Sequence, residues 1–152
     1  MLHCIRDEIG KLEKMILVQV KKDSRFHLLK TIPGVGPVLA MTIMLETGDI
    51  KRFEKVGNYS SYCRCVESRR VSNAKKKGEN NRRNGNPYLG WAFIEAAHFA
   101  IRFYEPIKRY YQRKLAKTKQ VVAIKTIAHK LSRASYFMLR DEVEFDMQKL
   151  FT

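Results

Sequence analysis

One serine in this sequence stands among cations in a way that could support phosphoryl chemistry. Ser72 lies in a long polar segment between two arginines and three lysines. These cations are Arg69, Arg70, Lys75, Lys76 and Lys77. A serine hydroxyl that attacks a phosphodiester needs nearby cations to lower its pKa and to stabilise the charged transition state. Most loop serines are instead solvated or cap a turn, so the residues alone leave both interpretations open.

A second candidate site is a glycine corner between two apolar helical stretches. Gly34, Val35 and Gly36 are bracketed by Pro33 and Pro37. Glycine accepts positive φ and close backbone approach, and proline suits the first turn of a helix. We therefore expect the amides of Gly34, Val35 and Gly36 to be exposed at a helix N-terminus, where they can bind a phosphate oxygen. This pattern is typical of a helix-hairpin-helix, which holds a nucleic-acid backbone without reading bases. A plain turn between helices is the alternative.

The charge distribution favours a polyanionic partner. The 152 residues carry a formal net charge of +15. Residues 64–83 hold eight basic and two acidic residues, and residues 102–119 hold seven and one. Concentrated charge of this kind indicates a phosphate-binding surface. Arg82, Arg83 and the helix-capping Asn86 complete the predicted nucleic-acid contacts.

Metal chemistry is not indicated by the remaining polar residues. Glu46, Asp49 and Glu54 have no paired acidic cluster elsewhere. Cys63 and Cys65 lack a second ligand pair at zinc spacing. We therefore expect no cofactor in this chain. Its three cysteines fit reduced thiols and a cytoplasmic location, and no apolar run is long enough to span a membrane.

The elements that must position these residues read as helices. An apolar stripe at coiled-coil spacing runs through Leu2, Ile5, Ile9, Leu12 and Ile16. Ser24 is expected to cap the next helix, and Gly48 to end the one that starts at Pro37. A helix should begin at Pro87 with Asn86 as its N-cap and end at Pro106. A further helix is expected from about Lys119 to Arg140.

These patterns predict an all-α fold: a helix-hairpin-helix-containing helical domain with a long basic loop and no strand. Residues 1–22 are expected to form a coiled-coil-like linker helix, and residues 23–152 the helix-hairpin-helix domain. The linker helix is the expected surface for homo-oligomerisation.

The order of the motifs resembles the C-terminal domain of insertion-sequence transposases of the IS110 group, which are related to pilin-gene-inverting recombinases. The likeness spans roughly Phe26 to Phe151. Its matching parts are, in order, the Ile32–Pro37 corner, Gly48-Asp49-Ile50-x-x-Phe53, the Tyr59-x-x-Tyr62 pair, the basic loop, Gly85-Asn86-x-x-Leu89, Glu95-Ala96-Ala97 and the late helix around Ala128-x-Lys130-Leu131. Family members place a serine fourteen residues before that asparagine, which is the spacing from Ser72 to Asn86. The resemblance implies that Ser72 is the family's covalent nucleophile.

The resemblance also implies a partner domain and two kinds of nucleic acid. Family proteins carry an N-terminal RuvC-like domain whose acids bind Mg²⁺, so we expect this chain to correspond to a C-terminal part. DNA is the expected substrate, and a structured guide RNA is expected in the full-length protein. A non-enzymatic helix-hairpin-helix module that binds DNA or RNA is the alternative. A basic ribosome-associated protein would explain the charge but not the glycine corner.

Overall fold

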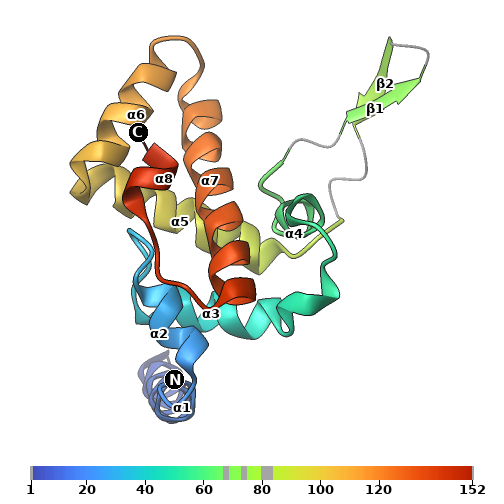
Figure 1. The fold of residues 1–152 in the computed structure, drawn as a ribbon. Coiled ribbons are helices and arrows are strands. Elements are labelled where there is room, and N and C mark those ends of the chain that lie inside the picture. The colour runs from blue at the N-terminus through green and yellow to red at the C-terminus, as the bar shows by residue number, and fades with distance from the viewer. Residues whose placement is uncertain (1, 67–68, 73–74, 80–83, 152) are drawn as a thin grey trace.

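The computed structural model describes residues 2–66, 69–72, 75–79 and 84–151, and covers the backbone alone in the two middle segments. In chain order the elements are α1 (Leu2–Val20), α2 (Ser24–Lys30), α3 (Pro37–Thr47), the short 3-10 helix η1 (Ile50–Arg52), α4 (Val56–Tyr62), β1 (Arg69–Ser72), β2 (Lys75–Glu79), α5 (Pro87–Phe103), α6 (Glu105–Leu115), α7 (Gln120–Asp141) and α8 (Met147–Phe151) (Figure 1). The predicted helical fold class is confirmed.

The expectation of a strandless basic loop is wrong in one respect. β1 and β2 form a two-stranded antiparallel hairpin in which Arg69 pairs with Glu79 and Ser72 with Lys75. The register shifts between Arg70 and Val71. The hairpin stands away from the helices (Figure 1). Strand alternation is a weak signal where both faces are polar, because no buried face repeats every second residue.

A second correction concerns the segment after α5. Pro106 was expected to end that helix, but α5 already ends at Phe103 and Pro106 lies in the first turn of α6. Proline is compatible with a first turn because the first amides of a helix have no intrahelical partner. The second basic block is therefore largely helical.

The core forms where α5 and α7 pack against each other. The fully buried residues of α5 include Leu89 and Phe93 and four small ones, namely Ala92, Ala96, Ala97 and Ala100. Small side chains let neighbouring backbones come close. Tyr59 of α4 is also fully buried, and its hydroxyl lies 2.9 Å from Thr47 Oγ1. Tyr59 of the Tyr-x-x-Tyr pair is therefore a core residue.

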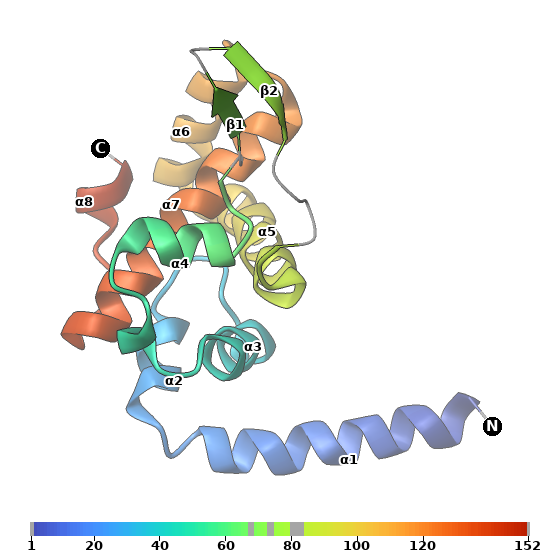
Figure 2. The same ribbon diagram turned by 90° about the vertical axis from the view of Figure 1, so that its right-hand side faces the viewer.

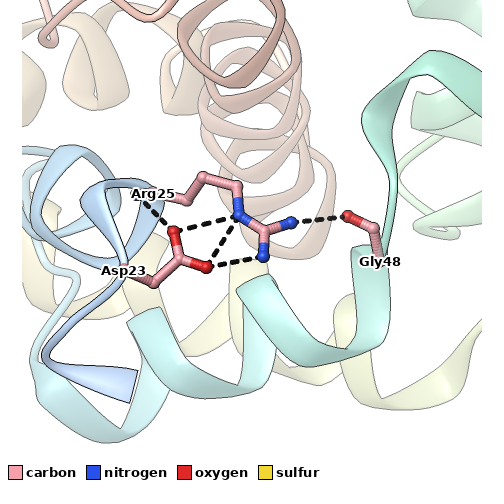
Figure 3. Close-up of polar contacts among 3 residues, drawn as sticks. All are labelled: Asp23, Arg25 and Gly48. Atoms are coloured by element: carbon pink, nitrogen blue, oxygen red, sulfur yellow. Dashed lines mark hydrogen bonds and ion pairs between the residues drawn. The ribbon is translucent and has the colours of Figure 1, made fainter. Parts of the chain in front are cut away.

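α2 is held against the end of α3 by a charged contact (Figure 3). Asp23, not Ser24, is the N-cap of α2, and its carboxylate accepts a hydrogen bond from the Arg25 amide at 2.8 Å. The Arg25 guanidinium also pairs with this carboxylate and donates to the carbonyl of Gly48 at 3.2 Å. Aspartate and serine are comparable N-caps, and this charged partner distinguishes the two neighbours.

α1 extends beyond the helical body as one straight helix (Figure 2). Its apolar stripe is exposed along its length, from 77% of the Leu2 side chain to 40% of Ile16. Val20, at its last turn, is buried in the core. The expected boundary after residue 22 falls between α1 and α2. No helix in the described part of the chain is long and apolar enough to cross a membrane.

Candidate nucleic-acid interface

The root of the hairpin, where residues 62–64 meet residues 84–86, is fixed on the helical body. The backbone amide of Asn86 donates to the carbonyl of Tyr62 at 2.7 Å. Arg64 Nε donates to the carbonyl of Asn84 at 3.0 Å. Between them Gly85 has φ +89°, and a Cβ there would lie 2.6 Å from the Tyr62 carbonyl oxygen. Only glycine therefore fits at position 85. The two hydrogen bonds hold the two ends of the basic segment together at a defined place.

Asn86 is the central side chain of this root. Its Oδ1 accepts hydrogen bonds from the amides of Tyr88 and Leu89, at 2.9 and 3.1 Å, and so caps α5. Its Nδ2 donates to Glu46 Oε2 at 2.6 Å and lies 3.4 Å from the Tyr62 hydroxyl. The predicted capping role is confirmed. Because the side chain is only 8% exposed and bonded within the protein, contact with nucleic acid remains a prediction.

Two residues that sequence reasoning did not assign complete the root. Glu46 receives the Asn86 amide, and the Arg52 guanidinium lies 4.7 Å from the Tyr62 ring centroid. The hydrogen bond from Asn86, and then the Arg52 guanidinium, lower the pKa of the Tyr62 hydroxyl. A buried N-cap asparagine needs acceptors for its amide hydrogens, which is the signal that could have pointed to a carboxylate partner.

The structure brings the predicted nucleophile and five of the predicted cations onto one hairpin. Ser72 is the last residue of β1, and its Cα pairs with Lys75, the first residue of β2. The remaining predicted contacts of the strands are Arg69, Arg70, Lys76 and Lys77. Arg82 and Arg83 lie outside the described residues. Lys75 is therefore the residue directly opposite Ser72 across the two strands.

The glycine corner faces the protein more than solvent. Gly34 has φ +83°, and a Cβ there would lie 2.1 Å from the carbonyl oxygen of Ala96 and 2.8 Å from the amide nitrogen of Ala100. Close packing of the corner on α5 therefore requires glycine at position 34. The amide of Val35 donates to the Ile32 carbonyl at 3.0 Å. The expectation that all three corner amides are open to a phosphate is therefore wrong for Val35, because the turn uses its donor.

Gly36 differs from its neighbours. It is exposed, has an ordinary φ of −85°, and is the N-cap of α3. It makes no side-chain cap, and no heavy atom lies within 4 Å of the position a Cβ would take. Of the three predicted corner residues, Gly36 lies where a ligand could approach the start of α3.

The buried thiols beneath the root are not arranged as metal ligands. Among the described residues no group of three or more histidine, cysteine or acidic side chains could hold a metal ion. Burial raises the pKa of Cys65 to about 11 and that of Cys63 still further. Both are therefore protonated thiols at neutral pH. Burial also lowers the pKa of His129, which lies near Arg133 and Lys130.

Comparison with known proteins gives these features a family. The model of the transposase IS116/IS110/IS902 family matches residues 26–112, and the chain belongs to this family. That segment includes the corner, the root and the whole basic hairpin.

Individual relatives agree with this assignment. A protein of insertion element IS110 from Streptomyces coelicolor is 28% identical over 142 residues, which cover 92% of this chain and 35% of the relative. A protein of insertion element IS116 from Streptomyces clavuligerus is 23% identical, with 93% and 36% covered. A probable family 20 transposase of Pseudomonas aeruginosa is 24% identical, with 66% and 30% covered. The chain thus spans about a third of the length of these relatives.

Proposed function

We propose that this chain is the DNA-binding C-terminal part of a serine-nucleophile transposase. The observation that carries the proposal is the position of Ser72, which ends a strand of a basic hairpin whose root is pinned to the helical body. Family membership supports the reaction class. In the full-length protein, a guide RNA aligns the DNA that Ser72 attacks.

The proposed step is a phosphoryl transfer without net hydrolysis. A bond forms between Ser72 Oγ and a backbone phosphorus, and one P–O bond of the DNA strand breaks. A base takes the serine proton, and the leaving oxygen gains a proton. The phosphoserine link keeps the free energy of the broken phosphodiester bond, so the strand can later be rejoined. Cations such as Lys75 stabilise the charge that develops on the phosphate oxygens.

Mg²⁺ has no site among the described residues, since no acidic cluster is present there. We place it in the acidic domain that the family resemblance implies, and no step above runs through it. The 152-residue chain by itself is therefore expected to bind nucleic acid without cutting it.

Binding should depend steeply on salt. Two basic blocks, each with a net charge of +6, are consistent with about six to ten phosphate contacts. Fluorescence anisotropy with a labelled oligonucleotide should then show affinity falling by about 10³-fold or more between 50 and 200 mM salt. Release of fewer than about two counterions would contradict the basic interface.

Covalent capture tests the nucleophile. The chain, combined with a matching acidic domain and the element's RNA, should form a protein–DNA adduct that survives denaturant. Ser72→Ala should abolish the adduct and leave binding nearly unchanged, because one hydroxyl adds little beside many phosphate contacts. Ser68→Ala is the matched control in the same segment. A full adduct yield from Ser72→Ala, or its loss in Ser68→Ala, would reject Ser72.

A non-enzymatic binding module is the second candidate. It is favoured by Gly36, whose open position at the start of α3 suits backbone binding without any nucleophile. It predicts salt-sensitive binding with no adduct under any condition.

The exposed stripe of α1 supports self-association of the whole protein. The side chains of Ile5, Ile9 and Leu12 are each about half exposed, at the a/d spacing that a second helix covers in a coiled coil. Ile9→Lys should lower the molar mass measured by light scattering to that of a monomer. An unchanged mass would place any oligomer contact elsewhere.

A further inference from the structure

A hollow of about 460 Å³ opens where the glycine corner faces the end of α5. Its size falls within the range of small-ligand pockets. The lining consists of the corner and first turn of α3, with three aromatic residues opposite: Gly34, Val35, Gly36, Pro37, Val38, Leu39, Phe99, Phe103 and Tyr104. None of these lining residues belongs to β1 or β2.

The aromatic wall is exposed to an unusual degree. The rings of Phe99 and Phe103 lie with centroids 6.5 Å apart and planes within 11° of parallel. Phe99 is 45% exposed, Phe103 67% and Tyr104 41%. Neighbouring exposed aromatic rings indicate a binding site, because covering their apolar surface is favourable.

The charges around the wall suit an anion. The Arg102 guanidinium lies 5.3 Å from the Phe103 ring centroid. The acidic neighbour Glu105 pairs with Arg109 at 3.3 Å, so its charge is balanced. Arg102, Glu105 and Arg109 all belong to the basic block 102–119, which has a net charge of +6. This positive charge favours an anionic ligand at the aromatic wall over a neutral or cationic one.

The opposite side of the hollow admits a flat group. Gly36 presents no Cβ, and no heavy atom occupies the space where one would lie. The start of α3 has no side-chain cap among the described residues, and Pro37 at its first position has no amide hydrogen to offer. The open space at Gly36 and the volume of the hollow leave room for a planar ring beside the aromatic residues.

We propose that this hollow binds an unpaired nucleobase of a single-stranded nucleic acid, stacked on the Phe103 wall with its phosphate toward Arg102. The proposal rests on the proposed nucleic-acid binding and adds the strand state of the ligand. Aromatic side chains with an adjacent arginine are the general means by which proteins hold single strands. In a duplex the bases are paired and stacked on one another, so their faces are not available to this wall.

Phe103→Ala tests the inference against a matched control. Phe137 is also an exposed phenylalanine with an arginine over its ring, since Arg140 lies 4.9 Å from the ring centroid. Anisotropy titrations at fixed salt should compare a single-stranded oligonucleotide carrying 2-aminopurine with the duplex of the same sequence. Phe103→Ala should weaken single-strand binding by about 5- to 150-fold and change duplex binding less than about twofold. Phe137→Ala should change neither, and Phe103→Trp should retain single-strand binding.

The outcomes separate this inference from the function on which it rests. If the unaltered chain binds no nucleic acid, the proposed function fails and the pocket proposal fails with it. If the chain binds, but Phe103→Ala weakens single strands and duplex equally or weakens neither, the pocket proposal alone is overturned. A change in molar mass with unchanged binding would identify the hollow as a protein interface and would also overturn it. Circular dichroism should confirm that both alanine variants fold.

Discussion

The glycine corner and the hairpin root are built from the same parts but use them differently. Each has a glycine at positive φ, at Gly34 and Gly85, and each is followed by a proline-started helix. In both, a Cβ on the glycine would collide with a carbonyl oxygen of another helix, Ala96 at 2.1 Å or Tyr62 at 2.6 Å. These glycines are therefore required by protein packing, not by the approach of a phosphate.

The caps that follow the glycines differ. Asn86 fills the start of α5 with two side-chain hydrogen bonds, whereas Gly36 leaves the start of α3 without a side-chain cap. A capped start fixes the hairpin, and an uncapped start is open to a ligand. The comparison indicates that rigidity resides at the root and ligand access at the corner.

Gly34→Val should have the largest effect of any change at these turns. Its side chain would collide with α5 and would need a φ that β-branched residues avoid, so we expect destabilisation by about 3 kcal/mol or more. Thermal unfolding followed by circular dichroism should show a Tm lower by about 10 °C. Gly36→Val, at an open position with φ −85°, should melt within about 2 °C of the parent. Equal melting of the two variants would contradict the packing role of Gly34.

Binding of the folded Gly36→Val variant now carries the test of the corner as a ligand site. Unchanged nucleic-acid affinity in that variant would leave the corner a structural turn.

Asn86→Ala should have the next largest effect. It removes the cap of α5 and leaves Glu46 without the amide at 2.6 Å, so we expect about 1–3 kcal/mol of destabilisation in urea unfolding. Asn86→Asp keeps the cap acceptor but places a carboxylate beside that of Glu46. The two carboxylates repel each other, so Asn86→Asp should also be destabilised although its cap acceptor is kept. Unchanged stability in Asn86→Asp would show that Glu46 does not contribute.

Asp23→Asn should have a smaller, pH-dependent effect on the α2–α3 pair. The hydrogen bonds from Arg25 lower the pKa of Asp23, so this contribution is present above about pH 4 and is lost as pH falls through the lowered pKa. Asparagine keeps the cap. Because the two side chains are 28% and 43% exposed, we expect under about 1 kcal/mol at pH 7 and no difference near pH 2. A difference that persists in acid would contradict the ion pair.

The smallest effect concerns the thiols beneath the root. Cys63 and Cys65 are buried and Cys4 is exposed. A thiol reagent at pH 8 should therefore modify one cysteine rapidly in the native protein and all three in denaturant. Gly85→Ala should speed modification of the buried pair by loosening the root, whereas Gly36→Val should not. Equal rates of thiol modification in the two variants would show that the root does not protect Cys63 and Cys65.

Much of the helical architecture follows from local sequence signals. Asn86 and Pro87 define the start of α5, and Pro37 and Gly48 bound α3, because caps and proline act within one helical turn. Pro106 was misleading because proline fits the first turn of a helix as well as the end of one. The hairpin was missed because its strands lack an apolar face.

The amino-acid sequence by itself determined the starts of α3 and α5, the two basic blocks and the spacing of Ser72 to Asn86 that the family resemblance uses. Only the tertiary structure decided that Gly34 packs on Ala96, that Asn86 bonds to Glu46, and that Phe103 faces the corner. These contacts join residues 40 or more positions apart in the chain, as the Glu46–Asn86 pair does. Caps and periodicity report on neighbours within a turn, whereas such pairs depend on how whole helices cross in the core.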